Sequence, residues 1–158
     1  MAIVRDAAFL ASAWQVLAIF CLKDNMTELT ESDMIWNRAC GEDPLRTLPG
    51  DRALADLLYA HGLAMNGGVL HAVECLTAEE LSDAQAGYRF YGFDDVASLL
   101  SRARSVFEAA DDLGSHEQRL DGEYIHFVPS DRFLDEHFQI RLKANPSDFA
   151  PLRVKDLG

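Results

Sequence analysis

Two histidines and a glutamate lie close together near the middle of the 158-residue chain, where they could hold a metal ion. His61 and His71 flank Gly67-Gly68, and Glu74 follows His71 by three residues, a spacing that places both side chains on one face of a helix. Imidazole nitrogens and carboxylate oxygens are zinc ligands. No cysteine pair, H-E-x-x-H or second E-x-x-H accompanies them, so the sequence favours polar or partly buried side chains over a metal site.

The turn sequence Asn66-Gly67-Gly68 has a second chemical interpretation, a loop that binds phosphate, because free N–H groups at a helix start bind anions. It lacks the lysine of a Walker loop and the spacing of a dinucleotide-binding loop, so a tight turn between two helices is the better interpretation. The chain also contains no G-x-S-x-G motif and no cysteine with the flanking residues of a thiol protease. We therefore expect no enzyme activity and no cofactor.

Carboxylates are the remaining chemical feature. The chain has 26 acidic and 14 basic residues and a formal net charge of -12, which disfavours direct contact with nucleic acid and with anionic membrane surfaces. Many carboxylates fall where helices are expected to begin, where they stabilise the helix dipole without needing a partner, and on sequence alone this explanation is the stronger one. Carboxylates of two neighbouring helix starts could instead imitate DNA phosphates. The best candidates for such a partner-binding cluster are Glu79, Glu80, Asp83, Asp94 and Asp95.

The elements that must position these side chains are predicted to be helices. Thr30 with Asp33, and Thr77 with Glu80, have the spacing of capping boxes. Apolar periodicity predicts helices near 30–39, 51–65, 69–76, 77–91, 93–110 and 131–145, with Asp51 capping the second of these. Residues 123–128 alternate enough for one short extended segment. The expected fold is all-α, a compact array of about six or seven helices in a single domain over residues 1–158.

The N-terminal run Ala7–Leu22 is apolar, but it is shorter than the roughly 20 residues of a membrane-spanning helix and lacks the marks of an export signal. Its thin polar stripe predicts a helix in the core or in a contact between subunits, which leaves a homodimer open. A short buried strand over residues 16–22 is the alternative. The three widely spaced cysteines, Cys21, Cys40 and Cys75, predict reduced thiols and a cytoplasmic protein.

The central helices resemble a known family. Gly50-Asp51, Leu57-Leu58, the turn Met65-Asn66-Gly67-Gly68 and the segment Ala84–Phe107 are similar to the C-terminal domain of the bacterial DNA-mimic protein family. The similarity covers roughly residues 50–150 and includes Asn145–Phe149, whereas residues 1–50 show no recognised resemblance. It implies a helical fold without a cofactor, and a surface that imitates the charge of DNA toward a DNA-binding protein.

Two functions remain open at this point. The first is an acidic protein-binding module that occupies the DNA-binding surface of a partner such as a transcription regulator. The second is a cytosolic immunity-type or regulatory protein-interaction module without DNA mimicry, which would bind through aromatic residues, as interface hot spots often do. Its candidates are Trp36, Tyr88, Phe90 and Tyr91, although Tyr88 and Tyr91 are better explained as core residues. A continuous acidic ridge favours the first function, and an exposed aromatic patch favours the second.

Overall fold

The computed structural model describes residues 29–153 and residue 156, and within them it contains six α-helices, one short 3-10 helix and no strand. The α-helices are α2 (Glu31–Ala39), α3 (Pro49–Cys75), α4 (Ala78–Phe90), α5 (Asp94–Ala109), α6 (Gly114–Phe127) and α7 (Asp131–Ala144), followed by the 3-10 helix η1 (Pro146–Asp148). The all-α prediction is confirmed. The helix predicted over Ala7–Leu22 lies outside the described residues.

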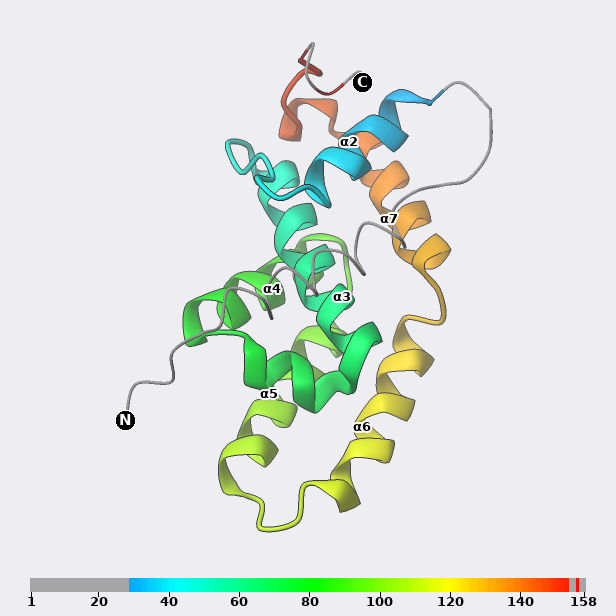
Figure 1. Cartoon of the computed structure of the whole chain (residues 1–158). Coiled ribbons are helices and arrows are strands. Elements are labelled where there is room, and N and C mark those ends of the chain that lie inside the picture. The colour runs from blue at the N-terminus through cyan, green and yellow to red at the C-terminus, as the bar shows by residue number, and fades with distance from the viewer. Residues whose placement is uncertain (1–28, 154–155, 157–158) are drawn as a thin grey trace.

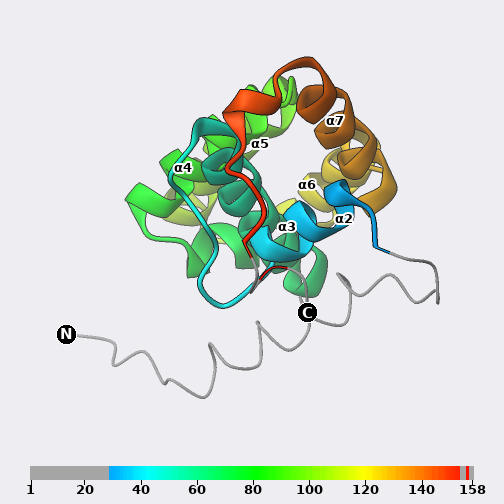
Figure 2. The ribbon, with the colours of Figure 1, turned by 90° about the horizontal axis from the view of Figure 1, so that it is seen from above.

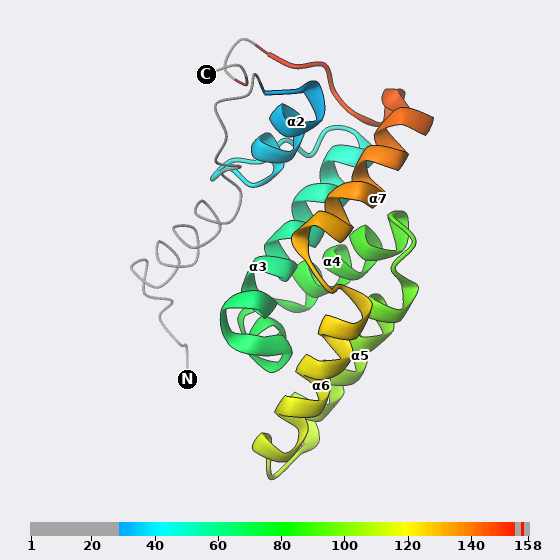
Figure 3. The ribbon, with the colours of Figure 1, turned by 90° about the vertical axis from the view of Figure 1, so that its right-hand side faces the viewer.

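The long helix α3 runs through the middle of the molecule and contacts α2, α4, α5, α6 and η1 (Figure 1). α4 and α5 lie on one side of α3, while α6 and α7 follow one another almost end to end along another side (Figure 3). α2 lies beside the start of α3, next to the C-terminal segment (Figure 2). Among the helices of the described residues, none is both long enough and apolar enough to cross a membrane.

Short polar motifs set three of the helix starts. Thr30 and Thr77 each accept a hydrogen bond from the backbone N–H three residues later, and the carboxylates of Asp33 and Glu80 accept from the threonine N–H in return. Ser130 caps α7 with its hydroxyl oxygen. These contacts satisfy N–H groups that have no partner inside the helix. Both predicted capping boxes are therefore present in the structure.

The start of α3 differs from the prediction. The helix begins at Pro49, and Asp51 lies inside its first turn with only 2% of its surface exposed. Proline at the first helical position lacks the N–H that would need a cap and already has a helical φ, so the helix starts two residues earlier than expected. The Asp51 carboxylate instead accepts hydrogen bonds from Arg38 Nη2 at 2.7 Å and from the Ala150 N–H at 2.8 Å.

The extended segment predicted at residues 123–128 is wrong, because these residues form the last turns of α6 and its C-cap. Leu120, Tyr124 and Val128 are spaced by four and are all buried, whereas Ile125 is 47% exposed. A spacing of four places side chains on one face of a helix, and here that face is turned to the core. The strand-like alternation over the same residues has no structural counterpart.

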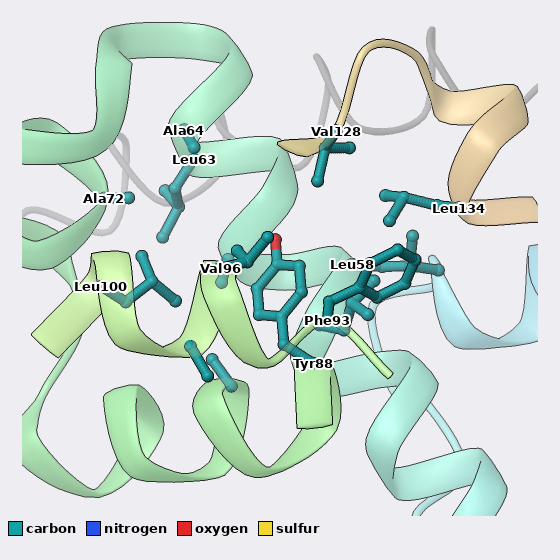
Figure 4. Packing of buried hydrophobic residues seen from close by; sticks show 14 of the residues in the cluster. Leu58, Leu63, Ala64, Ala72, Tyr88, Phe93, Val96, Leu100, Val128 and Leu134 are labelled. Carbon is teal, nitrogen blue, oxygen red and sulfur yellow. The ribbon is translucent and has the colours of Figure 1, made fainter. Parts of the chain in front are cut away.

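One hydrophobic cluster fills the space between the helices, and Tyr88, Phe93, Val128 and Leu134 are among its members (Figure 4). α3 and α4 approach each other closely at Gly87, where a Cβ atom would lie 2.6 Å from the carbonyl oxygen of Ala53. Any larger residue there would push the two helices apart. This close crossing fixes the position of α4 against α3.

The cysteines depart from the sequence-based expectation. Cys40, the residue after α2, is disulfide-bonded, so the prediction of reduced thiols is wrong for this residue. Cys75, at the end of α3, keeps its thiol, and its sulfur lies 3.6 Å from His71 Nε2. Separation along the chain does not report distance in space, which is why wide spacing could not exclude a disulfide.

Candidate functional site

The structure divides the five candidate carboxylates into two groups. α4 and α5 run in opposite directions, since Arg104 of α5 donates a hydrogen bond to the carbonyl oxygen of Leu76, just before α4, at 2.8 Å. The two helix starts therefore lie at opposite ends of the pair. Glu79 and Phe90, at the two ends of α4, are roughly 17 Å apart at the helical rise of about 1.5 Å per residue. The expectation that these two helix starts meet in one cluster is wrong, because consecutive helices joined by a short turn are antiparallel.

Four of the five carboxylates are exposed and form no ion pair within the described residues, namely Glu79, Asp83, Asp94 and Asp95. Glu80 differs, because its Oε2 accepts hydrogen bonds from the Thr77 N–H at 2.8 Å and from the Thr77 hydroxyl at 2.7 Å. Its negative charge is thus used to cap α4.

Asp83 faces a further carboxylate across the α3–α4 crossing. It lines a depression of about 240 Å³ together with Asp56 of α3 and Phe90 of α4. Burial raises the pKa of Asp56, the hydrogen bond from Arg46 at 2.9 Å lowers it, and the negative charge of Asp83 raises it again. Asp56 lies beside the group at the start of α4, but its ion pair with Arg46 means that it adds no unpaired charge to that group.

Most arginines are bound to groups of the protein itself. Within the described residues, the exposed or partly exposed ion pairs are Arg46–Asp56, Arg102–Glu123, Arg104–Glu108, Arg119–Glu123, Arg132–Glu136, Arg141–Asp148 and Arg153–Asp156. Arg38 is buried between Asp51 and Asp156. In the same part of the chain, the exposed carboxylates without an ion pair are Glu31, Glu42, Asp43, Glu74, Glu79, Asp83, Asp94, Asp95, Asp111, Asp112 and Glu117. The electrostatic potential at the surface of the described residues is therefore mainly negative and comes from these carboxylates.

The turn at Asn66-Gly67-Gly68 is a kink inside α3 at a single residue. Gly68 has φ 88° and ψ 170°, a conformation open only to glycine. The N–H of Val69, the next residue, donates to Asp121 Oδ1 of α6 at 2.8 Å. The first N–H after the kink is thus already bonded to a carboxylate of the same protein, that of Asp121. A phosphate at this position would be repelled by Asp121.

His61 belongs to a buried polar network that joins four helices. Its Nδ1 lies 2.7 Å from the Tyr124 hydroxyl oxygen of α6, and its Nε2 lies 2.8 Å from Oδ1 of Asp131 at the start of α7. The Tyr124 hydroxyl is in turn 2.8 Å from the hydroxyl of Tyr88 in α4. His61 is 7% exposed and Tyr88 is fully buried. The sequence draws attention to His61 but not to these partners.

One arrangement of protons satisfies every group in this network. Tyr88 donates to Tyr124, Tyr124 donates to His61 Nδ1, and His61 Nε2–H donates to Asp131. The reverse order would leave the Tyr88 O–H without an acceptor among the described residues, at a cost. The hydrogen bond from His61 lowers the pKa of Asp131, and burial raises the pKa of both phenols. This closed network explains His61 as a structural residue.

The other metal-ligand candidates lie apart from this network. His71 contacts Cys75, one turn further along α3, and Glu74 is exposed. Across the described part of the chain, no group of three or more potential metal-binding side chains comes together.

The aromatic residues of the alternative function do not form an exposed patch. Trp36, Tyr88 and Tyr91 are buried in the core. Phe90 is partly buried, and the guanidinium carbon of Arg141 lies 4.2 Å from the centre of its ring. An aromatic contact surface at these residues would require the core to open.

The family model described as DMP19-like protein matches residues 46–150. The chain belongs to the DMP19-like family. The match confirms the resemblance to the DNA-mimic family. No curated protein and no solved structure matches the chain. The DMP19-like region runs from just before α3 through η1, so it contains both groups of carboxylates on α4 and α5 and the whole His61 network.

Proposed function

We propose that this DMP19-like protein binds the DNA-contacting surface of another protein, such as a transcription regulator, and thereby keeps DNA off that surface. The observation that carries the proposal is the pairing pattern of the charges. Most arginines of the described residues are engaged in ion pairs within the protein, Arg52 and Arg89 being exposed without one, whereas a longer series of exposed carboxylates has no ion pair there. A DNA-binding protein presents lysine and arginine to phosphates, and carboxylates can accept the same charge-assisted hydrogen bonds.

The separation of the two carboxylate groups suits this role. DNA carries its phosphates at regular intervals along each strand and not in one dense cluster. Glu79 and Asp83 near the start of α4, and Asp94 and Asp95 at the start of α5, present negative charge at two places on adjoining helices. A basic surface shaped for two stretches of DNA backbone could contact both.

The first test is capture of the partner on the immobilised full-length chain, from lysate of the source organism. Bound protein is eluted first by stepwise salt and, in a parallel experiment, by duplex DNA. We expect a DNA-binding protein that leaves at moderate salt and also on addition of DNA, because both compete for its basic surface. A partner released by neither would exclude DNA mimicry.

Paired neutralising variants then locate the contact. Glu79→Gln with Asp83→Asn removes the first group, and Asp94→Asn with Asp95→Asn removes the second. Each should weaken partner binding by about tenfold or more, chiefly through loss of electrostatic attraction. Glu42→Gln with Asp43→Asn is the matched control, since it removes the same charge from the exposed loop before α3. Glu80 stays unchanged because its loss would uncap α4. Equal effects of all three variants would mean that only net charge matters.

We also propose a cytoplasmic location in a bacterium, because that is where a transcription regulator would be met. The Cys40 disulfide provides a direct test of this location, since stable disulfides are rare in reducing compartments. Thiols are alkylated in intact cells and the chain is then analysed by mass spectrometry. The proposed location requires that the Cys40 disulfide of the structure is reduced in the cell, so Cys40 should be alkylated there. A Cys40 disulfide in most molecules would contradict the cytoplasmic location.

We further propose that the protein acts by binding and has no catalytic activity, cofactor or direct contact with nucleic acid. Both ring nitrogens of His61 are engaged by neighbouring side chains, which leaves this buried histidine unavailable as a general base. Mixing the purified chain with duplex DNA at low salt should give no mobility shift. A shift at low salt would contradict the proposal.

A further inference from the structure

The outer face of α7 carries an exposed apolar residue in a groove. Ile140 is 68% exposed, more than any other large hydrophobic side chain of the described residues. It lines a groove of about 960 Å³ between α7, α2 and the segment that follows α7. Leu142, which is partly exposed, also lines the groove, and the buried core residues Ile35 and Phe149 lie at its base. Apolar surface that is gathered in one place and rimmed by polar residues marks contact surfaces.

Two opposite charges flank Ile140 in this groove. Glu136 lies one turn before it and Lys143 lies one turn after it, and both line the groove and are exposed. Glu136 forms a solvent-exposed ion pair with Arg132 at 2.9 Å, which is weakly held and can be shared. Lys143 is the sole lysine of the described residues and forms no ion pair there.

We propose that this groove is the contact surface between two copies of the chain, with the α7 helices antiparallel and the twofold axis passing beside Ile140. In a twofold contact the same surface must be complementary to itself. Rotation about an axis at Ile140 exchanges the two ends of the helix, so Glu136 of each copy faces Lys143 of the other. Two ion pairs then flank a shared apolar centre. A parallel pairing would instead bring like charges together.

The charge of the chain favours this site over other places for self-association. Copies with a net charge of -12 repel each other over most of their surface, and the groove offers a lysine beside its apolar residues. The contact would also leave the start of α4 free, because Arg141 of α7 contacts α4 at Phe90, the opposite end of that helix (Figures 1 and 2). This inference goes beyond the proposed function and does not depend on it.

Sedimentation velocity of the full chain over a range of concentrations tests the contact. We expect a dimer for the unchanged chain and a monomer for Ile140→Glu. Glu136→Lys and Lys143→Glu should each weaken the dimer by about tenfold or more, because each places like charges opposite one another. An equimolar mixture of these two variants should dimerise like the unchanged chain, since every facing pair then has opposite signs. This rescue by mixing would not arise from a purely structural effect of either substitution.

The matched control is Glu117→Lys, which makes the same charge change at an exposed residue of α6 and should leave the dimer unchanged. Circular dichroism of each variant shows whether the helices are retained. An unchanged chain that stays monomeric throughout would overturn the proposal, and would be expected if another segment of the same chain covered the groove. Failure of the mixed variants to associate better than either alone would overturn the antiparallel α7 pairing.

Discussion

At the scale of the residue, the Tyr124 hydroxyl is held from two sides, because it joins Tyr88 to His61 inside the core. Tyr124→Phe leaves both the Tyr88 O–H and His61 Nδ1 without partners, and we expect a loss of about 2–4 kcal/mol in the free energy of unfolding. Tyr88→Phe removes only the first donor of the hydrogen-bond network and leaves no other donor unpaired, so its expected cost is about 1 kcal/mol. Urea unfolding of the two variants measures the difference. Equal costs would contradict the proposed direction of the hydrogen bonds.

A second prediction at the residue scale concerns the pH dependence of the stability that Asp131 contributes. Its pKa is lowered from the ordinary value of 3.8, chiefly by the hydrogen bond from His61. Because the pKa of Asp131 is lower in the folded than in the unfolded chain, ionised Asp131 stabilises the fold at pH values above 3.8. This stabilisation is lost as the pH falls from 3.8 through the pKa of the folded chain. Asp131→Asn keeps a hydrogen-bond acceptor but cannot titrate. The stability difference between the unchanged chain and Asp131→Asn should therefore shrink on acidification. A difference independent of pH would show that the charge of Asp131 contributes nothing.

The sequence could identify His61 as unusual but could not identify its role. Periodicity and motif searches compare residues that are near in sequence, whereas Tyr124 and Asp131 lie in other helices, 63 and 70 residues away from His61. Their approach depends on how α6 and α7 pack along α3. The same limit applies to Asp121, whose contact with the Val69 N–H spans 52 residues.

At the scale of the element, the kink in α3 depends on Gly68 in two ways. Its backbone conformation excludes other residues, and a Cβ atom there would lie 2.9 Å from an Asp121 carboxylate oxygen. Gly68→Ala should destabilise the fold by about 3 kcal/mol, through backbone strain and displacement of the Asp121 cap. Gly92→Ala is the control, because Gly92 also has positive φ but no atom near its Cβ position, and about 1–2 kcal/mol is expected. Thermal unfolding of both variants compares them. Similar costs would mean that the Asp121 contact adds nothing.

The helices also show which sequence patterns were informative. Where a polar motif marks the start, as at Thr30 and Thr77, the sequence predicted the element correctly. The sequence did not predict α6, because its N-cap, Leu113, makes no side-chain hydrogen bond. In addition, a strand-like alternation of apolar residues overlaps the helical spacing near the end of α6. The period of four in Leu120, Tyr124 and Val128 was present but covers only three residues. A short apolar pattern is ambiguous without a cap to support it.

At the scale of the whole molecule, composition predicted the sign of the surface charge but not its distribution. The net charge of -12 follows from counting residues. Which carboxylates stay unpaired depends on pairs such as Arg102–Glu123, whose members come from α5 and α6. The helix-start pattern therefore identified exposed acidic residues on α4 and α5 while misjudging their arrangement, since chain direction separates the two starts.

The two ends of the described chain are joined through one buried cation, Arg38. Its guanidinium donates to Asp51 of α3 at 2.7 Å, to the Ala150 and Pro151 carbonyl oxygens, and to Asp156. Arg38→Met would leave Asp51 buried with its charge largely uncompensated. We expect a cost of about 3–5 kcal/mol in the free energy of unfolding, as for other broken buried ion pairs.

Arg119→Met is the matched control for this last prediction, since it makes the same substitution in an ion pair at the surface, with Glu123. Exposed pairs of this kind contribute about 0–1 kcal/mol. Urea unfolding should therefore separate the two variants clearly. In Arg38→Met, limited proteolysis should also cut the segment after η1 earlier than in the unchanged chain, because its carbonyl oxygens lose their donor. If both variants unfold alike, α2 and the C-terminal segment are held by apolar packing alone.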